Sequence, residues 1–245
     1  MKNLITRTIT GVLFVAVILG ATWFSQVSFR GLILITTILC LLEFYRLVNG
    51  NVSRWTLYAD ILGGTYLVGL LFLLPNMQPG IPGIYLFSPY IIYLLYTFIV
   101  RLYLKEENPI KSLSLSLTGQ IYVALPLGLL SYIAYPPLEP QYLLMPYNAL
   151  MVIAFFTFIW LNDTGAYIVG SLLGKHRLFE RISPKKSWEG FIGGVIFTLA
   201  AGWVWSTQCS FLSLSQWIGL SAVVAIFSTW GDLCESLLKR TLKVK

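Results

Sequence analysis

Long apolar stretches dominate the chain, and short polar clusters separate them. Five stretches carry no charged side chain, at residues 8–29, 61–100, 112–138, 140–162 and 190–231. A helix crosses a bilayer with about 20 apolar residues, so each stretch of roughly 40 residues predicts two helices joined by a turn. The whole pattern predicts eight membrane spans, at residues 6–26, 29–48, 56–74, 88–104, 113–135, 147–169, 190–207 and 214–236.

Composition favours a membrane protein over a soluble domain. Of the 245 residues, 57% are hydrophobic and only 11% are charged, whereas soluble domains average about 25% charged residues. Because an open sheet leaves backbone groups without hydrogen-bond partners in lipid, we predict an all-α, polytopic integral membrane protein. Two segments rich in proline and glycine, 75–89 and 136–146, are predicted as turns between spans.

Basic residues indicate the orientation of the predicted spans. If the N-terminus faces the cytoplasm, all 17 Lys and Arg residues except Arg30 fall on the cytoplasmic side. Such a bias is the positive-inside pattern of membrane proteins. It accounts for the net charge of +7 without nucleic acid, which we exclude as a partner.

A first polar cluster begins at the end of the sixth predicted span. Asp163, Tyr167 and Gly170 are spaced i, i+4 and i+7, so they share one face of a helix. A carboxylate in an apolar helix costs roughly 2.5–3.5 kcal/mol on insertion scales, which favours a functional reason for keeping it. We expect Asp163 to contact a metal ion or a polar part of a substrate. The alternative is an interhelical ion pair with a lysine or an arginine.

A second polar cluster lies on the eighth predicted span. Two carboxylates, a hydroxyl and an ammonium group share one helix face, at Asp232, Glu235, Ser236 and Lys239. Mg²⁺ prefers oxygen ligands and typically takes one or two carboxylates together with substrate phosphates. We therefore predict a Mg²⁺ site at Asp232. The alternative is a salt-bridged helix end.

The segment between these clusters is basic and rich in glycine. Its lysines precede the seventh predicted span, at Lys175, Lys185 and Lys186. Pro184 suits the entry of a helix, and Ser183 or Ser187 can cap it. A helix N-terminus with neighbouring lysines is an anion site that suits a triphosphate. The alternative is a positive-inside loop that touches anionic lipid.

Together these motifs resemble the phosphatidate cytidylyltransferase family, also called CDP-diacylglycerol synthases. The matching segments are Asp163-Thr-Gly-Ala-Tyr-Ile-Val-Gly170, Gly174-Lys-His, Ser183-Pro-Lys-Lys-Ser-Trp-Glu-Gly190, Gly193-Gly194 and Gly231-Asp-Leu-Cys-Glu-Ser-Leu-Leu-Lys-Arg240. Their order and spacing fit across residues 162–245, whereas the preceding residues match only as hydrophobic spans. Within one membrane-embedded unit, we distinguish N-terminal transmembrane helices at 1–161 from a C-terminal catalytic region at 162–245.

The resemblance implies that CTP and phosphatidic acid react to CDP-diacylglycerol and pyrophosphate, a step of phospholipid biosynthesis. It places the active site on the cytoplasmic face of a bacterial plasma membrane, with Mg²⁺ at Asp232, and leaves a homodimer open. The residues expected to act in catalysis are Asp163, Asp232, Glu235 and Lys239. Those expected to bind substrate are Lys175, Ser183, Lys185, Lys186, Ser236 and Arg240. Lys175, Lys185 and Lys186 would hold the triphosphate of CTP. Lys239 and Arg240 would hold the lipid phosphate.

The end of the sequence departs from the family pattern. Residues 236–245 follow the first part of the family signature. In the family, this part is followed by an aspartate and later by His-Gly-Gly and Asp-Arg-x-Asp. We therefore expect further carboxylates and a ninth helix to be missing, and the chain as given to be inactive for that reason.

Three other functions are weighed. A CTP-dependent lipid-alcohol kinase of the dolichol or phytol type would produce a monophosphate and CDP. A transporter would line a path through the membrane with charge, whereas the outer halves of the predicted spans are bare. A non-catalytic, truncated membrane protein is the third alternative.

Overall fold

The computed structural model describes residues 2–49, 53–76, 83–136 and 146–244. The chain divides into two compact units, Met1–Ala149 and Leu150–Lys245. Nearly all of the described chain is helical, and each of the eight predicted spans coincides with a helix or with a continuous row of helical segments. The predicted all-α architecture is confirmed.

The helices have the length and composition of membrane spans. Among the described residues, seven helices are long and apolar enough to cross a membrane, and they match the second to eighth predicted spans. The first predicted span lies in α1 (Lys2–Phe24), where the shorter apolar stretch is Thr8–Phe24. The chain is a multi-pass membrane protein.

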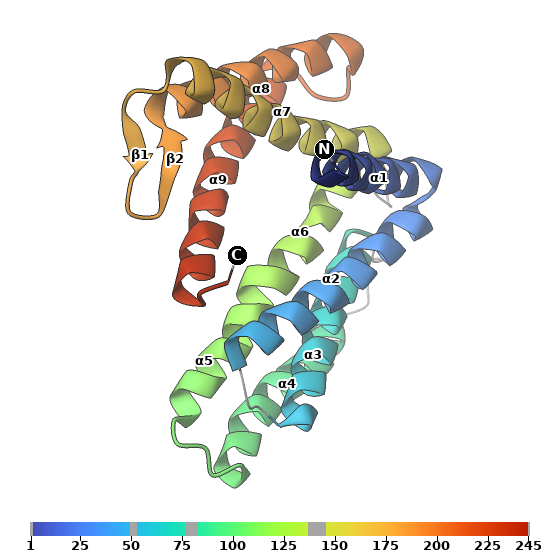
Figure 1. The fold of residues 1–245 in the computed structure, drawn as a ribbon. Helices are drawn as coiled ribbons and strands as arrows, with labels where there is room; N and C mark the ends of the chain where they lie inside the picture. Colours follow the sequence, from blue (N-terminus) through green and yellow to red (C-terminus); the bar gives the residue numbers. More distant parts are fainter. Residues whose placement is uncertain (1, 50–52, 77–82, 137–145, 245) are drawn as a thin grey trace. The chain divides into compact units, whose positions relative to one another are not determined.

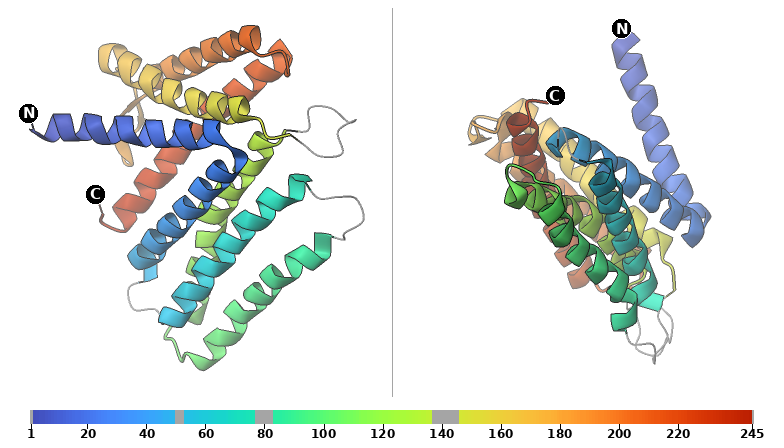
Figure 2. Two further views of the ribbon diagram at one scale, coloured as in Figure 1. Left: turned by 90° about the vertical axis from the view of Figure 1, so that its right-hand side faces the viewer. Right: turned by 90° about the horizontal axis from the view of Figure 1, so that it is seen from below.

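The N-terminal unit is a helical bundle. It comprises α1, α2 (Gln26–Asn49), α3 (Arg54–Leu73), the 3-10 turn η1 (Leu74–Asn76), α4 (Gly83–Tyr103), α5 (Pro109–Gly119), the π-helical segment η2 (Gln120–Ala124) and α6 (Leu125–Ala134). The α5, η2 and α6 segments form one rod (Figure 1). The central helix is α3, which contacts α2, α4 and α6. Figure 2 shows α1 diverging from α2 beyond the junction at Ser25.

A buried polar network joins the helices of this unit. Asp60 on α3 is 1% exposed and accepts hydrogen bonds from Tyr93 Oη at 2.9 Å and Ser116 Oγ at 2.6 Å. Arg101 donates to Ser116 Oγ and to Glu106 Oε1, both at 2.8 Å. Charges among apolar helices are costly unless they are paired, so these contacts hold α3, α4 and α5 together.

The start of α4 corrects the last part of the turn predicted at residues 75–89, of which 77–82 lie outside the described residues. The helix begins at Gly83, so Pro89 lies inside it. Proline has no N–H for the carbonyl of Tyr85, four residues back; the Ser88 hydroxyl donates to that carbonyl instead, at 2.7 Å. The other predicted turn, 136–146, falls mostly outside the described residues.

The C-terminal unit combines three long helices with a β-hairpin. Its elements are α7 (Ala149–Leu173), β1 (Arg177–Phe179), β2 (Ser183–Ser187), α8 (Trp188–Gln208) and α9 (Leu214–Thr241). Glycines allow α7 and α8 to approach closely: a Cβ added at Gly193 would collide with Val169, and one at Gly194 with Asn162. Small residues at helix interfaces serve this purpose in membranes. Figure 1 shows the hairpin beside α9.

The hairpin replaces the helix-entry loop predicted before α8. Its strands are antiparallel, with Arg177 opposite Ser187. Pro184 lies in β2 rather than in the first turn of α8, so its predicted role is wrong; a two-stranded hairpin has free edges, where proline is tolerated. Ser187 is the N-cap and accepts a hydrogen bond from the Gly190 amide at 3.1 Å.

Candidate active site

A cleft of about 500 Å³ opens between α7, the hairpin and α9. The three residues predicted to share a helix face, Asp163, Tyr167 and Gly170, all line it. Ser183, Lys185, Lys186 and Asp232 also belong to its lining. The structure therefore gathers five of the predicted site residues in one cavity, although they come from segments up to 69 positions apart in sequence, with Asp163 and Asp232 at the extremes.

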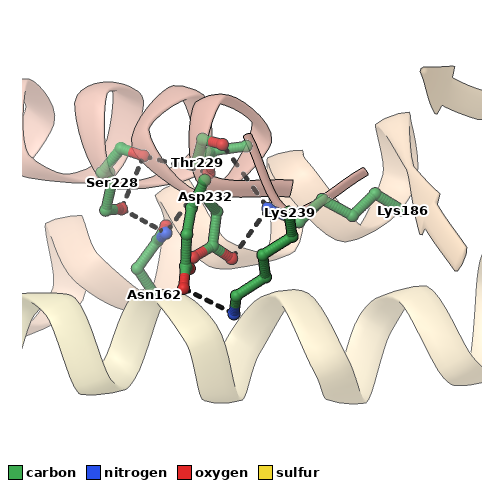
Figure 3. Close-up of polar contacts among 8 residues, drawn as sticks. Asn162, Lys186, Ser228, Thr229, Asp232 and Lys239 are labelled. Atoms are coloured by element: carbon green, nitrogen blue, oxygen red, sulfur yellow. Dashed lines mark hydrogen bonds and ion pairs between the residues drawn. The ribbon is translucent and has the colours of Figure 1, made fainter. Parts of the chain in front are cut away.

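An ion pair forms the charged centre of this cleft. Lys186 Nζ donates to Asp232 Oδ2 at 2.8 Å, and it lies 3.5 Å from the carbonyl oxygen of Thr229. Figure 3 shows the Lys186 side chain reaching toward the α9 turn that carries Thr229 and Asp232. Asp163 is close enough to interact electrostatically with both partners of the pair. Lys186 thus forms its ion pair with Asp232, and Asp163 lies near this pair.

Asn162 supports the base of the cleft, and the sequence reasoning did not select it. Its side chain is 1% exposed. Its Nδ2 donates to Ser228 Oγ at 2.7 Å and to Thr229 Oγ1 at 3.3 Å (Figure 3). Its Oδ1 is buried and accepts no hydrogen bond from the described residues. The sequence feature that could have identified Asn162 is its position: it is a polar amide next to Asp163 in an otherwise apolar helix.

Glu189 in the first turn of α8 fixes the start of the hairpin. Its carboxylate accepts hydrogen bonds from the amides of Lys175 at 3.1 Å and His176 at 3.2 Å. It also lies 2.6 Å from His176 Nδ1. The backbone of Lys175 is thereby held, while its side chain is not part of the cleft lining.

The polar face at the end of α9 does not line the cleft. Lys239 Nζ pairs with Glu235 Oε1 at 2.6 Å. For these two residues the structure therefore shows the salt-bridged helix end that the sequence offered as the alternative to a functional site. Ser236 shares this part of α9 and is also absent from the cleft lining. Their predicted roles in catalysis and substrate binding stay predictions.

Two contacts attach the hairpin to α9. Arg240 Nη1 donates to the carbonyl oxygen of Arg181 at 2.6 Å. Phe179 packs edge-to-face on Trp230, with ring centroids 5.7 Å apart. These contacts lie on either side of Asp232 along α9, so they hold β2 in the position where Lys186 reaches the Asp232 carboxylate.

The oxygen atoms of the cleft fit a hard divalent cation. The Asp163 and Asp232 carboxylates and the Thr229 carbonyl belong to residues of the lining. Within the described residues, no group of three or more His, Cys, Asp and Glu side chains could hold a metal ion. A cation here would complete its shell with water or substrate phosphate, which is usual for Mg²⁺.

Comparisons with known proteins found curated relatives that match part of the chain. Among curated proteins, the phosphatidate cytidylyltransferase of Staphylococcus haemolyticus (strain JCSC1435) is 47% identical over 92 residues. Those of Staphylococcus saprophyticus and Staphylococcus aureus (strain COL) are 44% and 41% identical over the same length. Each alignment covers 37% of this chain and 35% of the relative, so the matched part spans about a third of these relatives.

A family model covers far more of the chain. The model described as the cytidylyltransferase family matches residues 5–245, which include both units and every residue of the cleft. On this match, the chain belongs to the cytidylyltransferase family.

Proposed function

We propose that this protein transfers the cytidylyl group of CTP to phosphatidic acid, giving CDP-diacylglycerol and pyrophosphate. The observation that carries the proposal is the cleft of the C-terminal unit, which two carboxylates and two lysines line together among apolar helices long enough to cross a membrane. Membership of the cytidylyltransferase family supports CTP as the donor. The names of the staphylococcal relatives favour phosphatidate as the acceptor.

In the proposed reaction, an oxygen of the lipid phosphate attacks the α-phosphorus of CTP. A P–O bond forms there, the bond between the α- and β-phosphates breaks, and pyrophosphate leaves with the electron pair. The attacking phosphate is already anionic, so no general base is needed. Catalysis then consists of positioning the two phosphates and neutralising their charge.

The proposed roles within 162–245 follow from charge and position. Lys185 and Lys186 on β2 would hold the triphosphate, with the Ser183 hydroxyl beside them. Asp163 and Asp232 would repel a triphosphate unless a cation lies between them. Mg²⁺, when bound there, would neutralise charge on the leaving pyrophosphate, and Asn162 would help to orient its ligands.

The setting is the cytoplasmic face of a bacterial plasma membrane. The basic hairpin and the basic end of α9 favour that side by the positive-inside rule, and CTP is a cytoplasmic metabolite. The lipid phosphate reaches the cleft from the membrane surface. Arg240 and Lys239 would then lie at the edge where the lipid headgroup arrives, with Glu235 and Ser236 beside them on α9. Lys175 would contribute to binding the triphosphate.

Product analysis tests the proposal. The full-length gene product, purified in detergent, is incubated with CTP and Mg²⁺ and with phosphatidic acid, phytol or dolichol as acceptor. Of the three acceptors, we expect only phosphatidic acid to support the release of pyrophosphate from CTP. EDTA should stop this release. CDP together with phytyl or dolichyl monophosphate would instead identify a lipid-alcohol kinase and overturn the proposal.

A further inference from the structure

Lys186 lies where the proposed reaction needs a metal ion. We propose that Lys186 is a built-in counter-ion, which neutralises Asp232 in the metal-free protein and leaves this carboxylate when a divalent cation binds. The inference rests on the proposed function, which supplies the metal. It gives Lys186 two partners at different stages: a carboxylate before metal binding and a substrate phosphate afterwards.

The contacts of the ammonium group support this exchange. Lys186 Nζ lies 2.8 Å from Asp232 Oδ2 and 3.5 Å from the Thr229 carbonyl oxygen, both on one turn of α9. A carboxylate and a carbonyl are the oxygens that a hard cation would use. An ammonium group on these oxygens and a divalent cation beside them would repel each other and compete for the same negative charge, so binding of the cation favours release of Lys186.

Charge balance explains why some cation must be present. Asp163 and Asp232 interact electrostatically in the same cleft, and two carboxylates without a counter-ion repel each other. Lys186 pairs with Asp232 and so compensates one of these charges. A divalent cation compensates both, after which the ammonium group is free to bind an anion.

The pair is exposed enough to be exchanged. The Lys186 side chain is 27% exposed and the Asp232 side chain is 50% exposed, and ion pairs near the surface are weak. The hairpin does not depend on this contact, because Arg240 and the Phe179–Trp230 ring pair also attach it to α9. The exchange therefore moves a side chain and leaves β2 in place.

Lys185 provides a matched control. It is the neighbouring residue on β2, it lines the same cleft, and it carries the same charge. Within the described part of the chain, the ion pair with Asp232 belongs to Lys186 and none involves Lys185. Removing either lysine changes the net charge equally, but only Lys186 competes with a metal for Asp232.

Metal binding without nucleotide tests the inference. Mn²⁺ binding to the detergent-solubilised full-length protein is measured by electron paramagnetic resonance for the wild type and for Lys186→Met, Lys186→Gln, Lys186→Arg and Lys185→Met. Loss of a weak competing ion pair should tighten Mn²⁺ binding on the order of fivefold in both neutral Lys186 variants. Lys186→Arg should resemble the wild type, and Lys185→Met should change affinity by less than about twofold.

A second readout uses thermal unfolding of the same variants. Mn²⁺ should raise the Tm of Lys186→Met or Lys186→Gln more than that of Lys185→Met, because a tighter ligand stabilises the folded state more. Equal affinities and equal Tm shifts in the Lys186 and Lys185 variants would overturn the exchange and leave the proposed function standing. Wild-type protein that binds no Mn²⁺, or binds it equally well after Asp232→Asn, would overturn the metal site of the proposed function as well.

Discussion

Gly194 on α8 offers a direct test of how tightly the helices around the cleft are packed. A methyl carbon added there would lie 2.6 Å from Asn162 Oδ1 and 2.8 Å from the Asn162 carbonyl oxygen. The second atom belongs to the α7 backbone, so side-chain rotation cannot relieve the contact. Overpacking typically costs about 1–3 kcal/mol, while replacing a helical glycine by alanine contributes up to about 1 kcal/mol of stability. We expect Gly194→Ala to lower the free energy of unfolding by up to about 2 kcal/mol.

A matched glycine on α9 controls for helix propensity. No atom lies within 4 Å of a Cβ added at Gly219, so Gly219→Ala should be neutral or stabilising. Unfolding of both variants and the wild type is followed by far-ultraviolet circular dichroism during titration with SDS in mixed micelles. Equal stability of Gly194→Ala and Gly219→Ala would refute the close contact between α7 and α8. Because Asn162 precedes Asp163, Gly194→Ala should also slow turnover.

Three further predictions follow from the cleft and the hairpin. Asp232→Asn should reduce turnover by at least about 100-fold with unchanged helical content, because the size is kept while the charge that attracts Mg²⁺ is lost; turnover near the wild-type rate would argue against a role for this carboxylate. Arg240→Ala and Phe179→Ala should each raise the KM for CTP, because both residues attach the hairpin to α9, and Arg240→Ala should also raise the KM for phosphatidic acid; an unchanged KM for CTP in both variants would contradict the role of these contacts. A cysteine at position 180, on a background without native cysteines, should react with an impermeant reagent only in opened cells, and labelling in intact cells would contradict the orientation.

The sequence was sufficient for most of the fold. Membrane spans depend on local composition, so each of the eight predicted spans coincides with a helix or a continuous row of helical segments in the described part of the chain. The orientation drawn from charge asymmetry stays a prediction. Helix periodicity also placed Asp163, Tyr167 and Gly170 on one face, and all three line the cleft.

Contacts between distant segments could not be predicted in the same way. The ion pair between Lys186 and Asp232 joins residues 46 positions apart, and it depends on a hairpin that replaced an expected helix entry at Pro184. On α9, periodicity alone grouped Glu235 with Asp232, whereas the structure pairs Glu235 with Lys239. Asn162 was missed because an uncharged amide carries little signal until its burial is known.

The fate of the phosphorus atoms of CTP tests the central claim most directly. The full-length gene product is supplied with phosphatidic acid, Mg²⁺ and CTP labelled either at the α-phosphorus or at the γ-phosphorus, and the lipid is extracted and counted. Cytidylyl transfer predicts that the α-label enters the lipid and the γ-label leaves in pyrophosphate. Recovery of the γ-label in the lipid, or of neither label, would contradict the account.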